Sequence, residues 1–161
     1  TFIWWIKLLK YKKKKLIEWF ASMHIRHDYK KGTKIYPHIH WSHKSNKSWD
    51  VEWKIEYTYA RWYSLDEYPD PTTISLVQTA WEKYEHHIIE ADASQAIDLP
   101  NMDTDGVILF RIYRDAKEWD DTLDDHAYLI NFDLHYESDW YLTTEKNPDL
   151  WGTDTFIKNI A

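Results

Sequence analysis

The clearest pattern in the chain is a strict alternation of apolar and polar residues over 49–59. Every second position is large and apolar, and charged or hydroxyl residues lie between. A period of two places alternate side chains on opposite faces of a β-strand. The segment is therefore predicted to be a long strand, with a buried face formed by Trp49, Val51, Trp53, Ile55, Tyr57 and Tyr59.

Other segments repeat this pattern less fully. Residues 128–136 alternate in the same way, and 107–110 form a continuous apolar run of the kind found in a central sandwich strand. The apolar positions of the 128–136 segment are Tyr128, Ile130, Phe132, Leu134 and Tyr136. Weaker strands are predicted over 2–9, 18–27, 35–43, 73–79 and 85–92. The spacing of Trp81, Tyr84 and Ile88 also fits a short helix over 79–90, although a strand is preferred for its second half.

Turn-forming residues separate these segments at 28–32, 44–47, 68–71, 100–106 and 120–125. About eight short strands in 161 residues indicate a single all-β domain, an antiparallel β-sandwich of jelly-roll-like form. The predicted organisation is a basic and aromatic N-terminal segment over 1–17, the sandwich over 18–138 and an extended C-terminal arm over 139–161.

Composition narrows the function classes. The chain has no Cys and only 3 Gly, so disulfides, thiolate metal sites, cysteine nucleophiles and glycine-rich phosphate loops are excluded. Its 11 Trp and 12 Tyr exclude a disordered chain. Composition therefore indicates a folded, aromatic-rich β domain and supplies no catalytic signature; no catalytic residue is assigned and the protein is predicted not to be an enzyme.

Charge is distributed unevenly along the chain. The net charge is −7, but residues 1–80 hold 14 Lys and Arg against 8 Asp and Glu, and most of the acidic residues follow. Lysines cluster over 7–15, where they could face an acidic surface or form a solvated loop between strands. An acidic chain with one short basic cluster is not expected to bind nucleic acid.

The apolar start over residues 2–6 does not predict a membrane segment. A helix needs about 20 apolar residues to cross a bilayer. A signal peptide is not predicted either, because the basic run follows the apolar one.

Histidines give the strongest local motif, Tyr36-Pro37-His38-Ile39-His40-Trp41. On a strand, His38 and His40 share a face, so both imidazoles could bind one metal ion. The preferred third ligand is His135, which shares a polar strand face with Asp133. The alternative is that the three histidines are partly buried and hydrogen-bonded across strands. No other cofactor is predicted. Further candidates for the third ligand are His24, His27 and His43.

Other chemistries have weaker support. The cupin pattern shares His-x-His, but Lys44 and Ser45 stand where its Glu is required. The acidic turn over 120–125 could bind calcium, but it lacks the Gly and the Glu of an EF-hand loop and is expected to be solvated. Arg111 and Arg114 are expected to pair with the acidic turns.

The tryptophans are too many to belong to one strand face. Some are expected to be exposed, where aromatic side chains contact other proteins or stack on sugars. The predicted contact residues lie near turns and termini: Trp4, Trp5, Trp119, Trp140 and Trp151.

A series of motifs resembles a group of largely uncharacterised phage and virus structural proteins. That group carries Pro-His-Ser-Tyr-Lys-x-Gly-Thr, Pro-His-Ile-His-Trp, Glu-Tyr, Arg-x-x-Arg and Asp-x-His-Tyr in this order. Here the corresponding segments are 27–33, 37–41, 56–57, 111–114 and 133–136. No Pro precedes His27, so the first motif matches only in part.

The resemblance implies a β-sandwich in a virion component, such as a capsid decoration, head fibre or tail appendage. It also implies assembly of the chain with itself, as a homotrimer, and with other virion proteins. A second hypothesis is a module at a fibre tip that binds a host glycan or receptor. A third is a cupin-like metal-dependent enzyme using His38, His40 and His135.

Overall fold

The structure is a computed structural model that describes residues 9–11, 18–61 and 66–138. Every regular element in these ranges is a β-strand, so the all-β prediction is confirmed. The helix considered over 79–90 is wrong, because this segment contains the end of one strand, a loop and the next strand. The strands are β1 (Leu9–Tyr11), β2 (Glu18–His24), β3 (Ile35–His43), β4 (Trp49–Ala60), β5 (Thr72–Ala80), β6 (His87–Glu90), β7 (Val107–Arg114) and β8 (Ala127–Tyr136).

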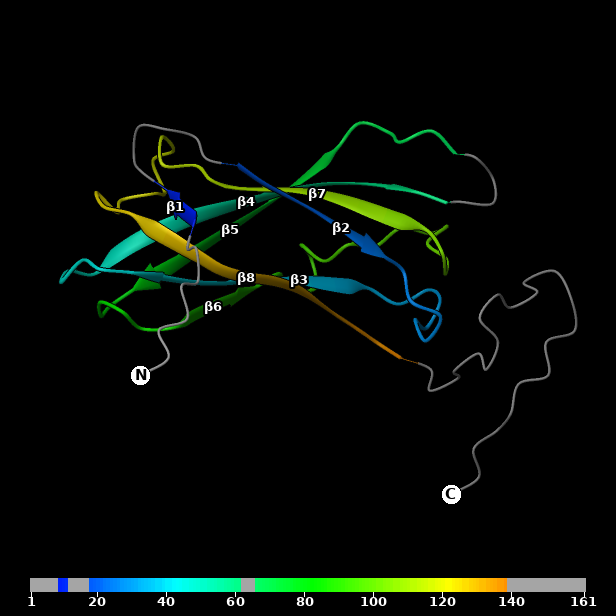
Figure 1. Cartoon of the computed structure of the whole chain (residues 1–161), viewed down its shortest axis with the longest axis horizontal. Helices are drawn as coiled ribbons and strands as arrows, with labels where there is room; N and C mark the ends of the chain where they lie inside the picture. The colour runs from blue at the N-terminus through cyan, green and yellow to red at the C-terminus, as the bar shows by residue number, and fades with distance from the viewer. Residues whose placement is uncertain (1–8, 12–17, 62–65, 139–161) are drawn as a thin grey trace, which may run out of the picture.

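The strands form two four-stranded antiparallel sheets (Figure 1). One sheet has the order β1-β8-β3-β6 and the other has the order β2-β7-β4-β5. The pairs are nested along the chain: β4 pairs with β5, β3 with β6, β2 with β7 and β1 with β8. The chain thus behaves as one long hairpin that is wound across both sheets.

This winding brings alternate loops to the same end of the sandwich. The loops that join β3 to β4, β5 to β6 and β7 to β8 lie at one end, on the left of Figure 1. The loops from β2 to β3 and from β6 to β7 lie at the other end. Side chains distant in sequence therefore meet at each end.

The core lies between the inner faces of the two sheets. The apolar positions over 49–59 face the core as predicted, since Val51, Trp53 and Ile55 are fully buried. Ile39 and Trp41 of β3 cover them from the opposite sheet, with the Trp41 and Trp53 rings 6.2 Å apart. Burying side chains of this size contributes about 1.5–3 kcal/mol each, so these two faces account for much of the stability of the fold.

The alternation over 128–136 does not hold throughout β8. The pairing with β3 shifts between His40 and Trp41, where the register passes from Asn131 to Leu129. This β-bulge leaves Ile130 unpaired and turns it outward, so Leu129 is buried and Ile130 is exposed. The prediction that Tyr128 and Ile130 lie on the buried face is therefore wrong, because one extra residue changes the side that faces the core.

The predicted N-terminal segment and C-terminal arm are only partly described by the structure. Residues 9–11, from the predicted N-terminal segment, form β1 and extend the sheet beside β8. The predicted arm over 139–161 and most of the lysine run over 7–15 lie outside the described residues. No described residues form a helix that is long and apolar enough to cross a membrane.

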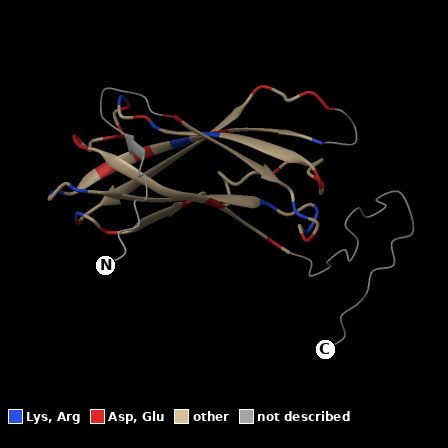
Figure 2. Ribbon diagram, in the orientation of Figure 1, with Lys and Arg blue, Asp and Glu red and all other residues tan. Residues whose placement is uncertain are grey.

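Charged residues lie mainly in the loops, with a further group along β4 and β7 (Figure 2). Arg111 does not pair with an acidic turn as predicted; it binds Glu18 and Glu56 on the neighbouring strands. Arg114 does bind the acidic turn over 120–125, through two hydrogen bonds to Asp121. Asp121 is buried, so the expectation of a fully solvated turn is wrong.

Candidate functional site

Strand β3 places its two motif histidines on the outer face of its sheet. Ile39 and Trp41 point into the core, so His38 and His40 point away from it. The register then supplies acidic neighbours, because His38 lies directly opposite Glu90 of β6 and Asp133 of β8. Directly opposed side chains in antiparallel strands are close enough to interact.

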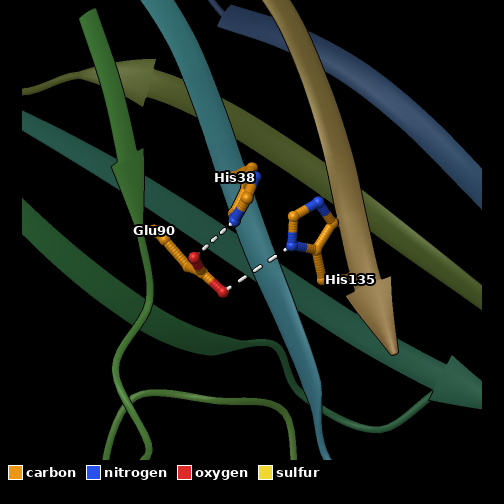
Figure 3. A group of neighbouring side chains, drawn as sticks. All are labelled: His38, Glu90 and His135. Atoms are coloured by element: carbon orange, nitrogen blue, oxygen red, sulfur yellow. Dashed lines mark ion pairs between the residues drawn. The ribbon is translucent and has the colours of Figure 1, made fainter. Parts of the chain in front are cut away.

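His38 is the centre of this cluster. Its Nε2 lies 2.7 Å from Oε2 of Glu90, and its Nδ1 lies 3.4 Å from Oδ1 of Asp133. The ring of His135 lies beside it, with the two ring centres 3.8 Å apart. Figure 3 shows Glu90 and His135 approaching His38 from the strands on its two sides. His38 is consequently only 6% exposed, although it lies on an outer face.

His40 faces the same carboxylate from its own side. Its Nε2 lies 3.4 Å from Oδ2 of Asp133, so the carboxylate lies between the two histidines. Its Nδ1 is hydrogen-bonded to Nε2 of His86, at 2.8 Å, and the two rings are stacked. One nitrogen of His40 thus has a hydrogen-bonding partner and the other faces Asp133.

Several atoms of the cluster are buried without making a hydrogen bond. They are Nε2 of His38, Nε2 of His40 and Oδ1 of Asp133. The close contact between His38 and Glu90 is an ion-pair distance and lacks hydrogen-bond alignment. Most buried polar atoms in proteins have a hydrogen-bonding partner, so three exceptions in one cluster require an explanation.

The predicted metal ligands fall into two different sets of neighbouring side chains, which share His38. His38, His40 and Asp133 form one set whose possible ligand atoms lie within 4.8 Å of one another. His38, Glu90 and His135 form a second set by the same measure. His40 and His135 therefore lie near His38 but in different sets, and the predicted trio does not form one site in the described chain.

The sequence pattern predicts the histidines but not all of their partners. It places Asp133 only as a neighbour of His135 on a polar strand face. It does not predict Glu90 or His86 as members of the cluster. The signal that could have found Glu90 is weak, because it is a single acidic residue after the apolar pair Ile88-Ile89.

The other candidate histidines lie in different surroundings. His43 is fully buried and its ring stacks on His87, at 5.4 Å between centres. Burial lowers the pKa of His43, and the neighbouring His87 lowers it further. Burial also lowers the pKa of His87. His24 and His27 both contact Oδ1 of Asp105, at 3.1 and 2.9 Å, near the opposite end of the sandwich.

The predicted contact residues can be placed only in part. Trp119 is 85% exposed, in the loop that joins β7 to β8. Trp4, Trp5, Trp140 and Trp151 lie outside the described residues. Four aromatic residues outside the predicted contact set are also exposed: Trp81 and Tyr84 in the loop that joins β5 to β6, Phe20 on β2, and Tyr68 before β5. Trp81, Tyr84 and Trp119 lie in loops at the same end of the sandwich (Figure 1).

Comparison of the chain with protein-family models, with curated proteins and with solved structures finds no match.

Proposed function

We propose that the chain is a non-enzymatic structural protein of a virus particle, working through contacts with copies of itself and with other virion proteins. The observation that carries the proposal is the nested strand order in two four-stranded sheets. We infer that this order is that of a jelly roll, which is the architecture of viral capsid domains and also of lectins and cupins.

The exposed aromatic end supplies a contact surface for such an assembly. Trp81, Tyr84 and Trp119 each leave most of their surface in solvent. Tryptophan and tyrosine are enriched among the residues that dominate protein interfaces, because they bury a large area with few rotatable bonds. Burial of this end against a second copy would remove the exposed rings from water.

Measurement of the mass in solution, together with electron microscopy, tests the proposal. We expect a homotrimer, and we expect a variant with Trp81→Ser and Trp119→Ser to be monomeric. The matched control is Phe20→Ser, which removes an exposed aromatic residue from strand β2. A stable wild-type monomer with no affinity for capsid or fibre proteins would overturn the proposal.

A second candidate function is binding of a glycan or receptor at a fibre tip. It is favoured by the clustering of Trp81 and Trp119 in loops at one end, since aromatic faces exposed together can stack on sugar rings. A glycan array distinguishes the two functions. Binding that is lost in the double tryptophan variant supports the glycan function, and an array without any signal removes it.

A further inference from the structure

We propose that His38, His40 and Asp133 bind a divalent ion of the zinc class on the outer face of the sheet β1-β8-β3-β6. The site joins two adjacent strands, since both histidines belong to β3 and the carboxylate belongs to β8. The inference does not depend on the virion function, because it concerns a ligand of the folded chain and not its assembly.

The ligand atoms are close enough for one ion, since one atom from each of the three residues lies within 4.8 Å of the other two. Asp133 offers Oδ1 at 3.4 Å from Nδ1 of His38 and Oδ2 at 3.4 Å from Nε2 of His40. Zinc binds imidazole nitrogen and carboxylate oxygen at about 2.0–2.2 Å, so two of its tetrahedral ligands are about 3.4 Å apart. Each histidine therefore already lies at a metal-ligand separation from the carboxylate.

The unsatisfied atoms provide an independent reason for the proposal. Nε2 of His40 and Oδ1 of Asp133 are buried and make no hydrogen bond. A bound cation would give both atoms a partner and would offset the cost of removing them from water. The cluster does not need to rearrange its strands for this, because the register already brings the groups together.

Both histidines also have an outer partner in a suitable position. Metal-binding histidines usually donate the N–H of the other ring nitrogen to an acceptor, which fixes the tautomer. In His40 that nitrogen is Nδ1, which is hydrogen-bonded to His86. In His38 it is Nε2, which lies 2.7 Å from the carboxylate of Glu90, although the two are not aligned as a hydrogen bond. The nitrogens on the other side of each ring face Asp133.

The second set, His38, Glu90 and His135, fits an ion less well. The side chains of Glu90 and His135 are 46% and 63% exposed, and the two are 3.9 Å apart at their nearest charged atoms. Asp133 is similarly exposed as a whole, but its Oδ1 is buried without a hydrogen bond, whereas neither Glu90 nor His135 has such an atom. We therefore assign Glu90 as a positioning residue for His38, acting from the opposite side of the ring (Figure 3).

Two imidazoles and one carboxylate match zinc well, and they leave a coordination position for water. An ion there would link β3 to β8 next to the β-bulge, where the pairing is interrupted. The expected consequence is a metal-dependent gain in thermal stability, since a ligand that binds only the folded chain stabilises it by mass action.

Titration of the chelator-treated full chain with Zn²⁺, followed by calorimetry, tests the proposal. We expect one ion per chain and a rise in the melting temperature as Zn²⁺ is added. Co²⁺ serves as a second probe, because its visible absorption reports ordered nitrogen and oxygen coordination. Absence of saturable binding by either ion would overturn the proposal.

Single variants then locate the ion. Loss of a residue that hydrogen-bonds a metal ligand weakens metal binding by about 10- to 100-fold. We expect His40→Gln and Asp133→Asn, which remove ligands, to weaken Zn²⁺ binding by more than this. We expect His86→Gln to cause a loss within that range. His86 is exposed, so this variant still tests the site if a ligand variant fails to fold.

Two controls separate this site from other histidines. His126→Gln removes a histidine that contacts a carboxylate elsewhere, Asp125, and should leave the affinity within about two-fold. His135→Gln should do the same. Loss of binding in His135→Gln together with normal binding in Asp133→Asn would overturn the assignment, because it would place the ion in the second set. Equal affinity in the wild type and His40→Gln would also overturn it.

Discussion

Each sheet carries on its outer face a basic side chain between carboxylates of the two neighbouring strands. On β7, Arg111 binds Glu18 of β2 and Glu56 of β4, at 2.6 and 2.7 Å. On β3, His38 lies between Glu90 of β6 and Asp133 of β8. The two clusters have the same layout, so their different properties come from the central side chain.

The arginine cluster is complete in itself. Arg111 is always charged and has several N–H donors, and its hydrogen bonds to Glu18 and Glu56 raise its pKa further. Tyr113 donates to the other oxygen of Glu56, at 2.9 Å, and its ring lies against the guanidinium group. Burial, with the hydrogen bond to Glu56, raises the pKa of Tyr113 to about 12. This cluster is best explained as structural.

The histidine cluster is not complete. Nε2 of His38 lies 2.7 Å from the Glu90 carboxylate but makes no hydrogen bond, whereas Arg111 donates a hydrogen bond to each of its two carboxylates. Buried atoms of His40 and Asp133 make no hydrogen bond. A polar cluster whose buried atoms all make hydrogen bonds is explained by its support of the fold. A cluster with buried polar atoms that make no hydrogen bond is a candidate ligand-binding site.

The largest effect is expected where an arginine–carboxylate pair is fully buried. Arg114 and Asp121 have side chains with 0% exposure and are joined by two hydrogen bonds. Asp121→Asn removes the negative charge from this buried pair, which costs about 3–5 kcal/mol. Urea unfolding of the variant and of the wild type measures this loss.

The matched control is Asp124→Asn, which removes an exposed carboxylate from the same turn. Its free energy of unfolding should change by less than about 0.5 kcal/mol. If the free energy of unfolding of Asp121→Asn also changes by no more than about 0.5 kcal/mol, the buried pair does not stabilise the fold. A structural role for the arginine–carboxylate contacts in this protein would then be contradicted.

Much of the fold follows from sequence because alternation records which strand face is buried. The segment over 49–59 shows this best, since its apolar positions line the core. The same reasoning fails at Tyr128 and Ile130, because alternation assumes an uninterrupted register. The bulge beside Trp41 is set by the pairing of β8 with β3, and a single strand carries no record of it.

Only the part of the candidate site that lies on a single strand could be predicted from the sequence. His38 and His40 share a face because they are two residues apart. The position of Asp133 opposite His38 depends on which strands are neighbours and on their register, and Glu90 comes from a third strand. Spacing along the chain contains neither fact, so the sequence predicts His135 as the third residue, whereas the structure places Asp133 between the two histidines.

Two histidines on the inner face, His43 and His87, differ from His38 in that burial outweighs their carboxylate neighbours, of which Glu85 lies 4.0 Å from Nε2 of His87. Burial lowers the pKa values of His43 and His87 below that of the unfolded chain, about 6.5. Below that pH the unfolded state binds more protons. The stability contributed by these groups is therefore complete above about pH 6.5, and it is lost as the pH falls through the folded-state values.

We expect the melting temperature to fall between about pH 7 and pH 5, and to fall less steeply in a variant with His43→Phe and His87→Phe. Thermal unfolding at a series of pH values measures the two slopes. Identical slopes in the wild type and the double variant would show that the inner pair is not held neutral.

The smallest effect is expected for the outer carboxylate when no metal is bound. In the presence of a chelator, Asp133→Asn should change the free energy of unfolding by less than about 1 kcal/mol, because Asp133 is partly exposed and makes no aligned contact with either histidine. Arg111→Met should cost more, since it removes the cation that lies between Glu18 of β2 and Glu56 of β4. Urea unfolding of both variants in chelator gives the comparison directly. If Asp133→Asn lowers the free energy of unfolding as much as Arg111→Met does, then the histidine cluster supports the fold as the arginine cluster does. Its buried atoms without hydrogen bonds would then no longer indicate a ligand-binding site.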